Sequence, residues 1–243
     1  MVYESRFYRE KVAAGGLMSF TVVNAETDLH VSAQRDLSRE ATALVVELRG
    51  DVESYIAMHP RFAESYAPLE VESGAPEVVR AMAEGARAAG VGPMAAVAGA
   101  IAERVARGLA RLSAEVIVEN GGDLFVMGAT DRVIALWAGS SPFASTLGLR
   151  VGASMLPVAV CTSSGTIGHS TSFGRADTVT VLAVDAALAD AAATALANLV
   201  RGEADIERAL AAGQAIGGVV GVLVMVGERI GAWGAVELVP LGE

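Results

Sequence analysis

Cysteine is almost absent from this 243-residue chain, which carries only Cys161. One cysteine excludes an intrachain disulfide and favours a reducing compartment. Charged residues are also sparse, at 19% of the chain, and the basic ones are scattered along an acidic chain of net charge −10. This distribution argues against nucleic acid as the main partner. It is compatible with divalent cations, although acidity also serves solubility alone.

Long hydrophobic runs are missing as well. The most apolar run, residues 219–226, is far too short to span a bilayer. The first twelve residues carry charges of both signs and contain no apolar segment, so they do not resemble a signal peptide. These features predict a cytoplasmic protein without a membrane-inserted segment.

Aromatic residues make up only 5% of the chain, whereas 53% of it is hydrophobic. The chain can therefore bury a sizeable core, and that core must be built from small aliphatic side chains. Hydrophobic periodicity predicts an α+β fold of strands, then helices, then strands, in an order that occurs twice. The expected strands are 17–23, 28–34, 115–119, 123–128, 132–138, 146–151, 157–162, 178–184, 219–226 and 229–239, and the expected helices are 36–57, 77–89, 93–111, 186–200 and 204–212.

The repeated order of elements predicts two similar halves, about 1–130 and 131–243, which share one core in a single domain, 1–243. No linker rich in proline, serine or charge separates the halves. A continuous alternation of strand and helix is absent, which argues against a doubly wound dinucleotide-binding fold.

Polar residues are concentrated after Cys161, in the run CTSSGTIGHSTSFGRAD. Glycines and consecutive backbone N–H groups can form an anion-binding concavity, to which hydroxyls add donors. A solvated serine-rich loop is the alternative. We predict ligand contacts from residues of this run, and catalytic roles for two of them, since a histidine can carry a proton or bond structurally to a carbonyl. The ligand-binding candidates are Thr162, Ser163, Ser164, Gly165, Thr166 and Ser170, and the catalytic candidates are His169 and Ser164.

Two further patterns point to a site. Asp190 and Thr194 lie one turn apart on an expected helix, so a carboxylate and a hydroxyl share a face where Mg²⁺ could find oxygen ligands. An exposed Asp, with a Thr bonded into its own helix, is the alternative.

The run ENGGD offers Asn120, Gly121, Gly122 and Asp123 around a tight turn, which either approaches a planar ligand or is an ordinary hairpin turn. Cys161 is either a nucleophile or a small buried residue, and the second alternative is favoured.

The runs GPMAAVAGAIAE, ENGGD, TSSG and ALADAAATA, in this order, resemble the ApbE-like proteins, whose best-known branch is the Mg²⁺-dependent FAD:protein FMN transferases. The FYRE start, the ETDL strand and the whole serine-rich run resemble an uncharacterised branch of that superfamily. After TSSG the transferases carry His-x-x-Asp-Pro-x-Thr-Gly, whereas this chain has GHSTSFGRAD and keeps only the histidine.

The resemblance implies a T-fold-like α+β architecture and a cofactor set of Mg²⁺ with FAD or FMN. It implies that Asp190, Thr194 and the backbone carbonyl of Ala98 hold the metal, with Gly99 as the other candidate for the carbonyl. The expected function is binding of a flavin or similar nucleotide, with transfer or hydrolysis at its pyrophosphate. The alternatives are a non-catalytic ligand-binding protein and a sulfur-assimilation accessory protein that uses Cys161. A protein partner and a homo-oligomer are left open.

Overall fold

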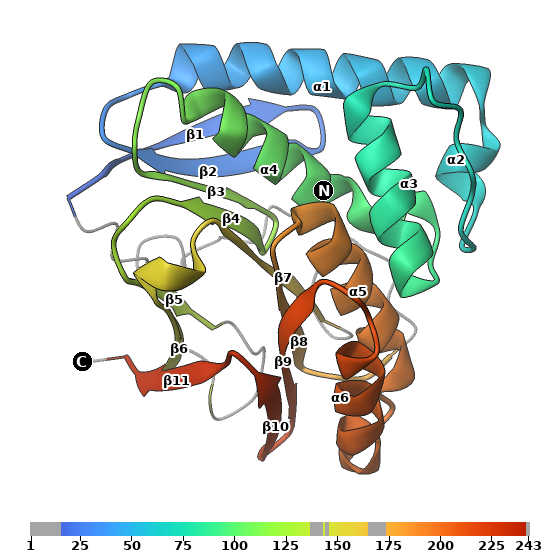
Figure 1. The fold of residues 1–243 in the computed structure, drawn as a ribbon, viewed down its shortest axis with the longest axis vertical. Coiled ribbons are helices and arrows are strands. Elements are labelled where there is room, and N and C mark those ends of the chain that lie inside the picture. Colours follow the sequence, from blue (N-terminus) through green and yellow to red (C-terminus); the bar gives the residue numbers. More distant parts are fainter. Residues whose placement is uncertain (1–15, 137–142, 144–145, 165–173, 242–243) are drawn as a thin grey trace.

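The computed structural model describes residues 16–136, 143, 146–164 and 174–241. Its centre is an antiparallel sheet of eight strands in the order β1-β2-β3-β4-β7-β8-β9-β10, beside a three-stranded sheet in the order β11-β6-β5 (Figure 1). The strands are β1 Met18–Asn24, β2 Thr27–Ala33, β3 Val116–Asn120, β4 Asp123–Met127, β5 Arg132–Ala135, β6 Leu147–Val151, β7 Val158–Ser163, β8 Thr178–Ala183, β9 Val219–Val226, β10 Arg229–Gly234 and β11 Glu237–Pro240.

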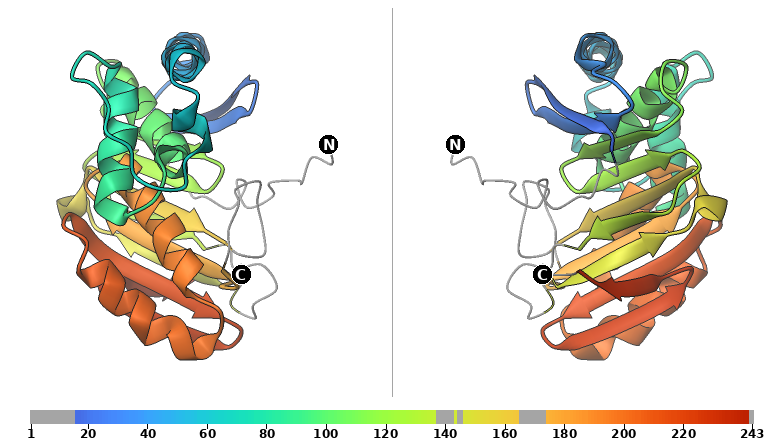
Figure 2. Two further views of the ribbon diagram at one scale, coloured as in Figure 1. Left: turned by 90° about the vertical axis from the view of Figure 1, so that its right-hand side faces the viewer. Right: turned by 90° about the vertical axis from the view of Figure 1, so that its left-hand side faces the viewer.

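The helices gather on one face of the large sheet (Figures 1 and 2). They are α1 Ser38–Met58, α2 Arg61–Glu64, α3 Glu77–Ala89, α4 Val97–Leu109, α5 Ala186–Leu199 and α6 Ile206–Gln214. Helix α5 packs on β7 and β8 and also against α3 and α4. Within the described ranges, no helix combines the length and the apolar character needed to cross a membrane.

Alternating side chains of the large sheet enter two different apolar clusters. Val118 and Phe125 face the helices, whereas Ile117 and Val126 pack with side chains of the small sheet. Both faces of the central strands are therefore covered, which explains why these strands read as continuous apolar runs. Burying each such Val or Leu contributes about 1.5–3 kcal/mol. As expected, Ala, Val and Leu make up most of this core.

The predicted α+β class and the antiparallel strands are confirmed. Four strands, β1 to β4, and then four more, β7 to β10, occupy the large sheet in chain order, with helices inserted after the second strand of each set. The division of one domain into similar halves, 1–130 and 131–243, stays a prediction, because strand order alone does not establish a duplication.

The structure differs from the predicted elements in two places. The expected strand 229–239 is wrong: it breaks at Gly234, where a φ of 76° turns the chain out of the large sheet, and β11 then pairs with β6. A Cβ at Gly234 would lie 2.2 Å from the carbonyl oxygen of Val220, so only glycine fits this crossing. The short helix α2 lies between the expected helices 36–57 and 77–89, where no element was predicted.

Candidate functional site

The ENGGD run forms a tight hairpin turn between β3 and β4. Asn120 pairs with Asp123, and the two glycines between them have φ values of 70° and 109°. Positive φ at both central positions is the geometry that glycine supplies at no steric cost. The backbone N–H of Gly122 donates to Glu119 Oε1 at 2.9 Å. Asn120 and Asp123 are both buried, so the turn holds two polar side chains out of solvent.

At Gly99, helix α4 lies so close to the start of α5 that no side chain would fit between the two helices. A Cβ at Gly99 would lie 2.2 Å from the carbonyl oxygen of Ala186 and 2.9 Å from Asp190 Cβ. This close approach lets the backbone N–H of Gly99 donate to Asp190 Oδ2 at 2.9 Å. The small residues of the run GPMAAVAGAIAE therefore allow a backbone group of α4 to reach a carboxylate of α5.

The carbonyl of Ala98, next to the Gly99 N–H, is contacted by a side chain of the β3–β4 turn. Asn120 Nδ2 donates to the carbonyl oxygen of Ala98 at 3.1 Å. The Ala98 carbonyl and the Gly99 N–H belong to one peptide group, so this group joins the β3–β4 turn to α5. Three segments that are far apart in the sequence, near residues 98, 120 and 190, meet at this point. We call Asn120, Asp190 and the Ala98–Gly99 peptide group the peptide clamp.

Two carboxyl groups, that of Asp190 in the peptide clamp and that of Asp123 beside it, have raised pKa values. Burial raises the pKa of Asp190 to about 7, and the N–H groups of Gly99 and Ala98 oppose the rise. Burial and then the negative charge of Asp190 raise the pKa of Asp123 well above its ordinary value. The backbone N–H of Thr162 offsets part of this by donating to Asp123 Oδ1 at 3.2 Å. A bound cation would relieve the repulsion between the two carboxylates.

The raised pKa of Asp190 predicts how the stability of the metal-free protein depends on pH. The native state holds this proton to a pH of about 7, whereas the unfolded chain releases it near 3.8. Stability from this group is therefore complete below pH 3.8 and is lost as the pH rises through 7. In EDTA, we expect Asp190→Asn to raise the Tm at pH 8 by about 4–8 °C, for a relief of about 2 kcal/mol at a half-buried site.

Thermal unfolding of both proteins at pH 5 and pH 8 measures this difference. The asparagine keeps an acceptor oxygen for the Gly99 N–H, so the comparison isolates the charge. At pH 5 the Tm difference should be smaller than at pH 8, because pH 5 lies nearer to the pKa of the unfolded chain and less of this stability has been lost. A Tm difference that is the same at both pH values would contradict the assignment.

Cys161 lies beside the same carboxyl groups, completely buried on β7. Its Sγ donates to the carbonyl oxygen of Ala186 at 3.7 Å. Burial, then the charges of Asp123 and Asp190, raise the pKa of the thiol well above its ordinary value. A thiol in this state is a poor nucleophile. The prediction of a small buried residue is confirmed, and the burial gives no support to a sulfur-carrying role.

Thr194 lies one turn after Asp190 on α5, half-buried, as the sequence spacing predicted. The Ala98 carbonyl, the Asp190 carboxylate and the Thr194 hydroxyl are all oxygen donors, the type that Mg²⁺ prefers. Among the described residues, no three His, Cys, Asp or Glu side chains gather as a metal site. A cation here would therefore depend on backbone and hydroxyl oxygens together with one carboxylate.

The serine-rich run is described only at its start. Thr162 turns its hydroxyl away from the clamp, toward Thr180 Oγ1 at 2.9 Å, on the face of β7 that packs with the small sheet. Ser163 is buried and Ser164 is half-buried at the end of β7. The candidates Gly165, Thr166, His169 and Ser170 lie outside the described residues.

Glu103 is a site-supporting residue that the sequence patterns did not single out. It is 6% exposed, and its Oε2 accepts the N–H of Ala186 at 2.7 Å. Its Oε1 accepts from Arg107 Nε at 2.7 Å. Glu103 therefore fixes the first turn of α5, one turn before Asp190. The feature of the sequence that could have identified Glu103 is its position as a single carboxylate directly after the apolar run 92–102.

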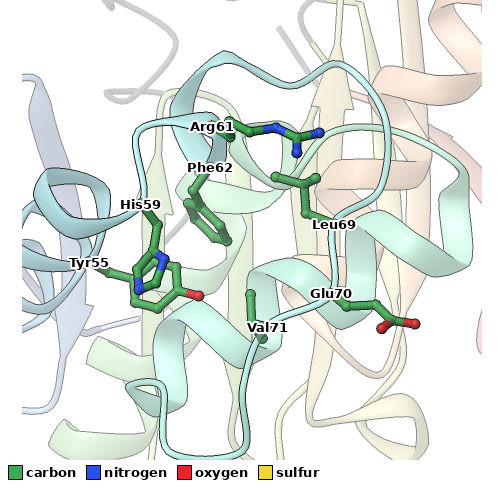
Figure 3. Close-up of a pocket in the computed structure, with 7 residues that line it drawn as sticks. All are labelled: Tyr55, His59, Arg61, Phe62, Leu69, Glu70 and Val71. Atoms are coloured by element: carbon green, nitrogen blue, oxygen red, sulfur yellow. The ribbon is translucent and has the colours of Figure 1, made fainter.

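A separate pocket of about 170 Å³ lies beyond the end of α1 (Figure 3). There the His59 ring stacks on Tyr55 with centroids 4.3 Å apart, and Tyr55 Oη donates to Glu72 Oε2 at 2.9 Å. The described lining residues include none of the residues predicted for the site. They are Tyr55, His59, Arg61, Phe62, Leu69, Glu70 and Val71.

A family model described as AbpE bacteria matches residues 9–225. A UPF0280 protein of Methanocaldococcus jannaschii is 43% identical over 207 residues, which cover 83% of this chain and 84% of that protein. A UPF0280 protein of Methanopyrus kandleri is 43% identical over 199 residues, covering 80% of both.

Solved structures share the fold at low sequence identity. The flavin transferase ApbE from Vibrio cholerae superposes with a TM-score of 0.59 at 17% identity, covering 90% of this chain and 97% of that one. The ApbE protein from Thermotoga maritima gives a TM-score of 0.55 at 15% identity, covering 88% of this chain and 96% of that one. The predicted ApbE-like fold is thereby confirmed.

Proposed function

The chain belongs to the AbpE bacteria family, and we propose that it binds a flavin or similar nucleotide together with Mg²⁺ and acts on the nucleotide's pyrophosphate. The observation that carries the proposal is the peptide clamp, where the Asp190 carboxylate and the Ala98–Gly99 peptide group are fixed together. The flavin is suggested by the solved structures that share this fold, which are described as flavin transferases. The resemblance of the sequence to the same superfamily supports this choice of ligand.

The residues of the site suit a hard divalent cation. Asp190, Thr194 and the Ala98 carbonyl would hold Mg²⁺, because they supply the oxygen donors that it prefers. The buried carboxyls of Asp123 and Asp190 repel each other, and a cation would stabilise both in their charged forms. When bound, Mg²⁺ supplies charge neutralisation at phosphate oxygens and orients them.

The chain's own groups would hold the nucleotide around this point. The turn residues Asn120 to Asp123 border one side. The hydroxyl and N–H groups of the serine-rich run would donate to phosphate oxygens, because consecutive backbone N–H groups favour anions. The proposed contacts are Asn120, Gly121, Gly122, Asp123, Ser163, Ser164, Gly165, Thr166 and Ser170. Thr162 is left out, because its hydroxyl contacts Thr180 and its backbone N–H donates to Asp123.

His169 and Ser164 are the proposed catalytic residues. In hydrolysis, a water oxygen attacks a pyrophosphate phosphorus, the bridging P–O bond breaks, and FAD yields FMN and AMP. His169 would take the proton of that water, or of an acceptor hydroxyl if the flavin phosphate is transferred to a protein. Ser164 would donate a hydrogen bond to the charge that develops on the phosphate oxygens.

Titration with FAD, with and without Mg²⁺, tests the proposal. We expect FAD to bind, and the binding to weaken when EDTA removes the metal, because the cation would neutralise charge on the phosphate oxygens. We expect Asp190→Asn to lose the metal dependence, because it removes the only proposed ligand that carries charge. Asp51→Asn, on α1, is the matched control and should behave as the wild type. The absence of FAD binding at millimolar ligand would refute the proposal.

Product analysis after long incubation then separates the reaction from simple binding. Chromatography that detects FMN and AMP supports hydrolysis, and flavin covalently attached to an added protein supports transfer. Intact FAD recovered in full would favour a non-catalytic ligand-binding protein. The same samples, passed over a sizing column, would show whether the protein forms a homo-oligomer.

A further inference from the structure

We propose that the pocket beyond the end of α1 is a second binding site, which takes a small aromatic carboxylate, that is, one planar ring with a single anionic group. The pocket lies between the last turn of α1, the short helix α2 and residues 69–71 (Figure 3). The proposal goes beyond the proposed function, because none of the residues proposed for the nucleotide or the metal lines this pocket.

The size of the pocket suits one ring. Its volume is about 170 Å³. An apolar cavity of about 150 Å³ is large enough to hold benzene. The three fused rings of a flavin need considerably more room, so this pocket is not an alternative place for the flavin itself. Leu69 and Val71, both half-buried, supply aliphatic surface that a bound ring would cover.

One wall of the pocket is a fixed group of three aromatic rings. The His59 ring stacks on Tyr55 with the two planes inclined by 26°, and the Phe62 ring meets Tyr55 edge-on with centroids 5.1 Å apart. Tyr55 and Phe62 are 4% and 1% exposed, and both belong to the same apolar cluster as Met82 of α3. Because the rings are held by this packing, the wall is already formed before a ligand binds, which lowers the entropic cost of binding.

Glu72 holds the polar atoms of this wall. Tyr55 Oη donates to Glu72 Oε2 at 2.9 Å, and His59 Nε2 lies 3.7 Å from Glu72 Oε1. These two rings therefore direct their polar atoms to a carboxylate of the protein. The ligand would meet mainly their carbon atoms, and its polar group has to be recognised by another residue of the lining.

Arg61 is the residue of the lining that can recognise an anion. Within the described ranges, no acidic side chain pairs with its guanidinium, which lies beside Leu69 at the edge of the pocket (Figure 3). The carboxylate of Glu70 points away from the rings in the same view. A planar guanidinium binds a carboxylate through two parallel N–H···O bonds. The lining therefore favours an aromatic ligand that carries a carboxylate.

Titration of the ¹⁵N-labelled full chain with benzoate, followed in ¹H–¹⁵N correlation spectra, tests the proposal. We expect benzoate to bind in about the millimolar range that so small a ligand can reach. Benzamide has nearly the same shape without the charge. We expect it to bind about three- to fivefold more weakly, because an ion pair with an exposed side chain contributes about that factor at most.

Two variants locate the site. Arg61→Gln removes the charge, so benzoate and benzamide should then bind equally. Val71→Trp fills the pocket with a larger side chain, so neither probe should bind. Arg39→Gln is the matched control, since it changes an exposed arginine about 30 Å away at the other end of α1, and it should keep the wild-type preference for benzoate.

The absence of binding at tens of millimolar benzoate would overturn the site. Equal affinities of the wild type for benzoate and benzamide would overturn the choice of an anionic ligand. Unchanged benzoate binding in folded Val71→Trp would mean that the probe binds elsewhere, and the proposal would fail. If Val71→Trp does not fold, Arg61→Gln carries the measurement, because its position is exposed. FAD binding is measured separately, so the proposed function stands or falls independently of these results.

Discussion

Gly99→Ala is expected to destabilise the protein by about 3 kcal/mol or more, whereas the same change at Gly50 should stabilise it slightly. At Gly99 the added methyl would meet the carbonyl oxygen and carbon of Ala186 at 2.2 and 2.8 Å. Both atoms are backbone, so no flexible side chain can yield, and overpacking of this kind costs 1–3 kcal/mol or more. For a chain of this size the Tm should fall by roughly 6–12 °C.

Gly50 is the control because it also lies within a helix, α1, with no atom within 4 Å of an added Cβ. Alanine there removes the entropic cost of a helical glycine, which is about 0.5–1 kcal/mol. Thermal unfolding of the two variants beside the wild type measures the contrast. Equal Tm values for the two variants would show that α4 and α5 do not pack as closely as described.

Glu103→Ala is expected to destabilise the protein by about 2–4 kcal/mol. The change leaves the N–H of Ala186 without its acceptor and removes a buried ion-pair partner of Arg107. Breaking a buried pair costs about 3–5 kcal/mol, and the lower figure applies here because the Arg107 side chain is 44% exposed. Because Glu103 fixes the first turn of α5, we also expect weaker Mg²⁺ binding at Asp190.

Glu77→Ala provides the comparison, since it breaks the corresponding pair with Arg104 at the surface. The Glu77 side chain is 69% exposed, and such pairs contribute at most about 1 kcal/mol. Urea unfolding of the two variants gives both free energies from their midpoints. A loss below 1 kcal/mol in Glu103→Ala would contradict the capping role of this carboxylate.

Much of the fold follows from local patterns in the sequence. Alternating and continuous apolar runs identified the strands, and the end of α1 at Met58 follows from the proline at position 60. The prediction of one continuous strand over 229–239 was wrong because of a single residue, Gly234, and its contact with a neighbouring strand. In the sequence, Gly234 resembles any other residue of a strand. Its close approach to Val220 of the neighbouring strand is seen only in the structure.

The candidate site could be predicted only in part. The Asp190–Thr194 spacing shows in the sequence because both residues lie on one helix. The bond between Gly99 and Asp190 joins residues 91 positions apart, and no periodicity reveals which turns of two helices will face each other. The sequence also pointed to the Thr162 hydroxyl, whereas in the structure its backbone N–H donates to Asp123 and its hydroxyl contacts Thr180.

The Ala98–Gly99 peptide group makes the two sides of the site thermodynamically dependent on each other. Its carbonyl and its N–H share one resonance system, so withdrawing electrons at the oxygen makes the N–H a stronger donor. The hydrogen bond that Asn120 donates to the Ala98 oxygen therefore strengthens the one that Gly99 donates to Asp190. Such coupling is reciprocal, so a change that weakens the Asp190 contact also weakens the Asn120 contact. The β3–β4 turn and helix α5, which are far apart in the sequence, are thus coupled through a single amide plane.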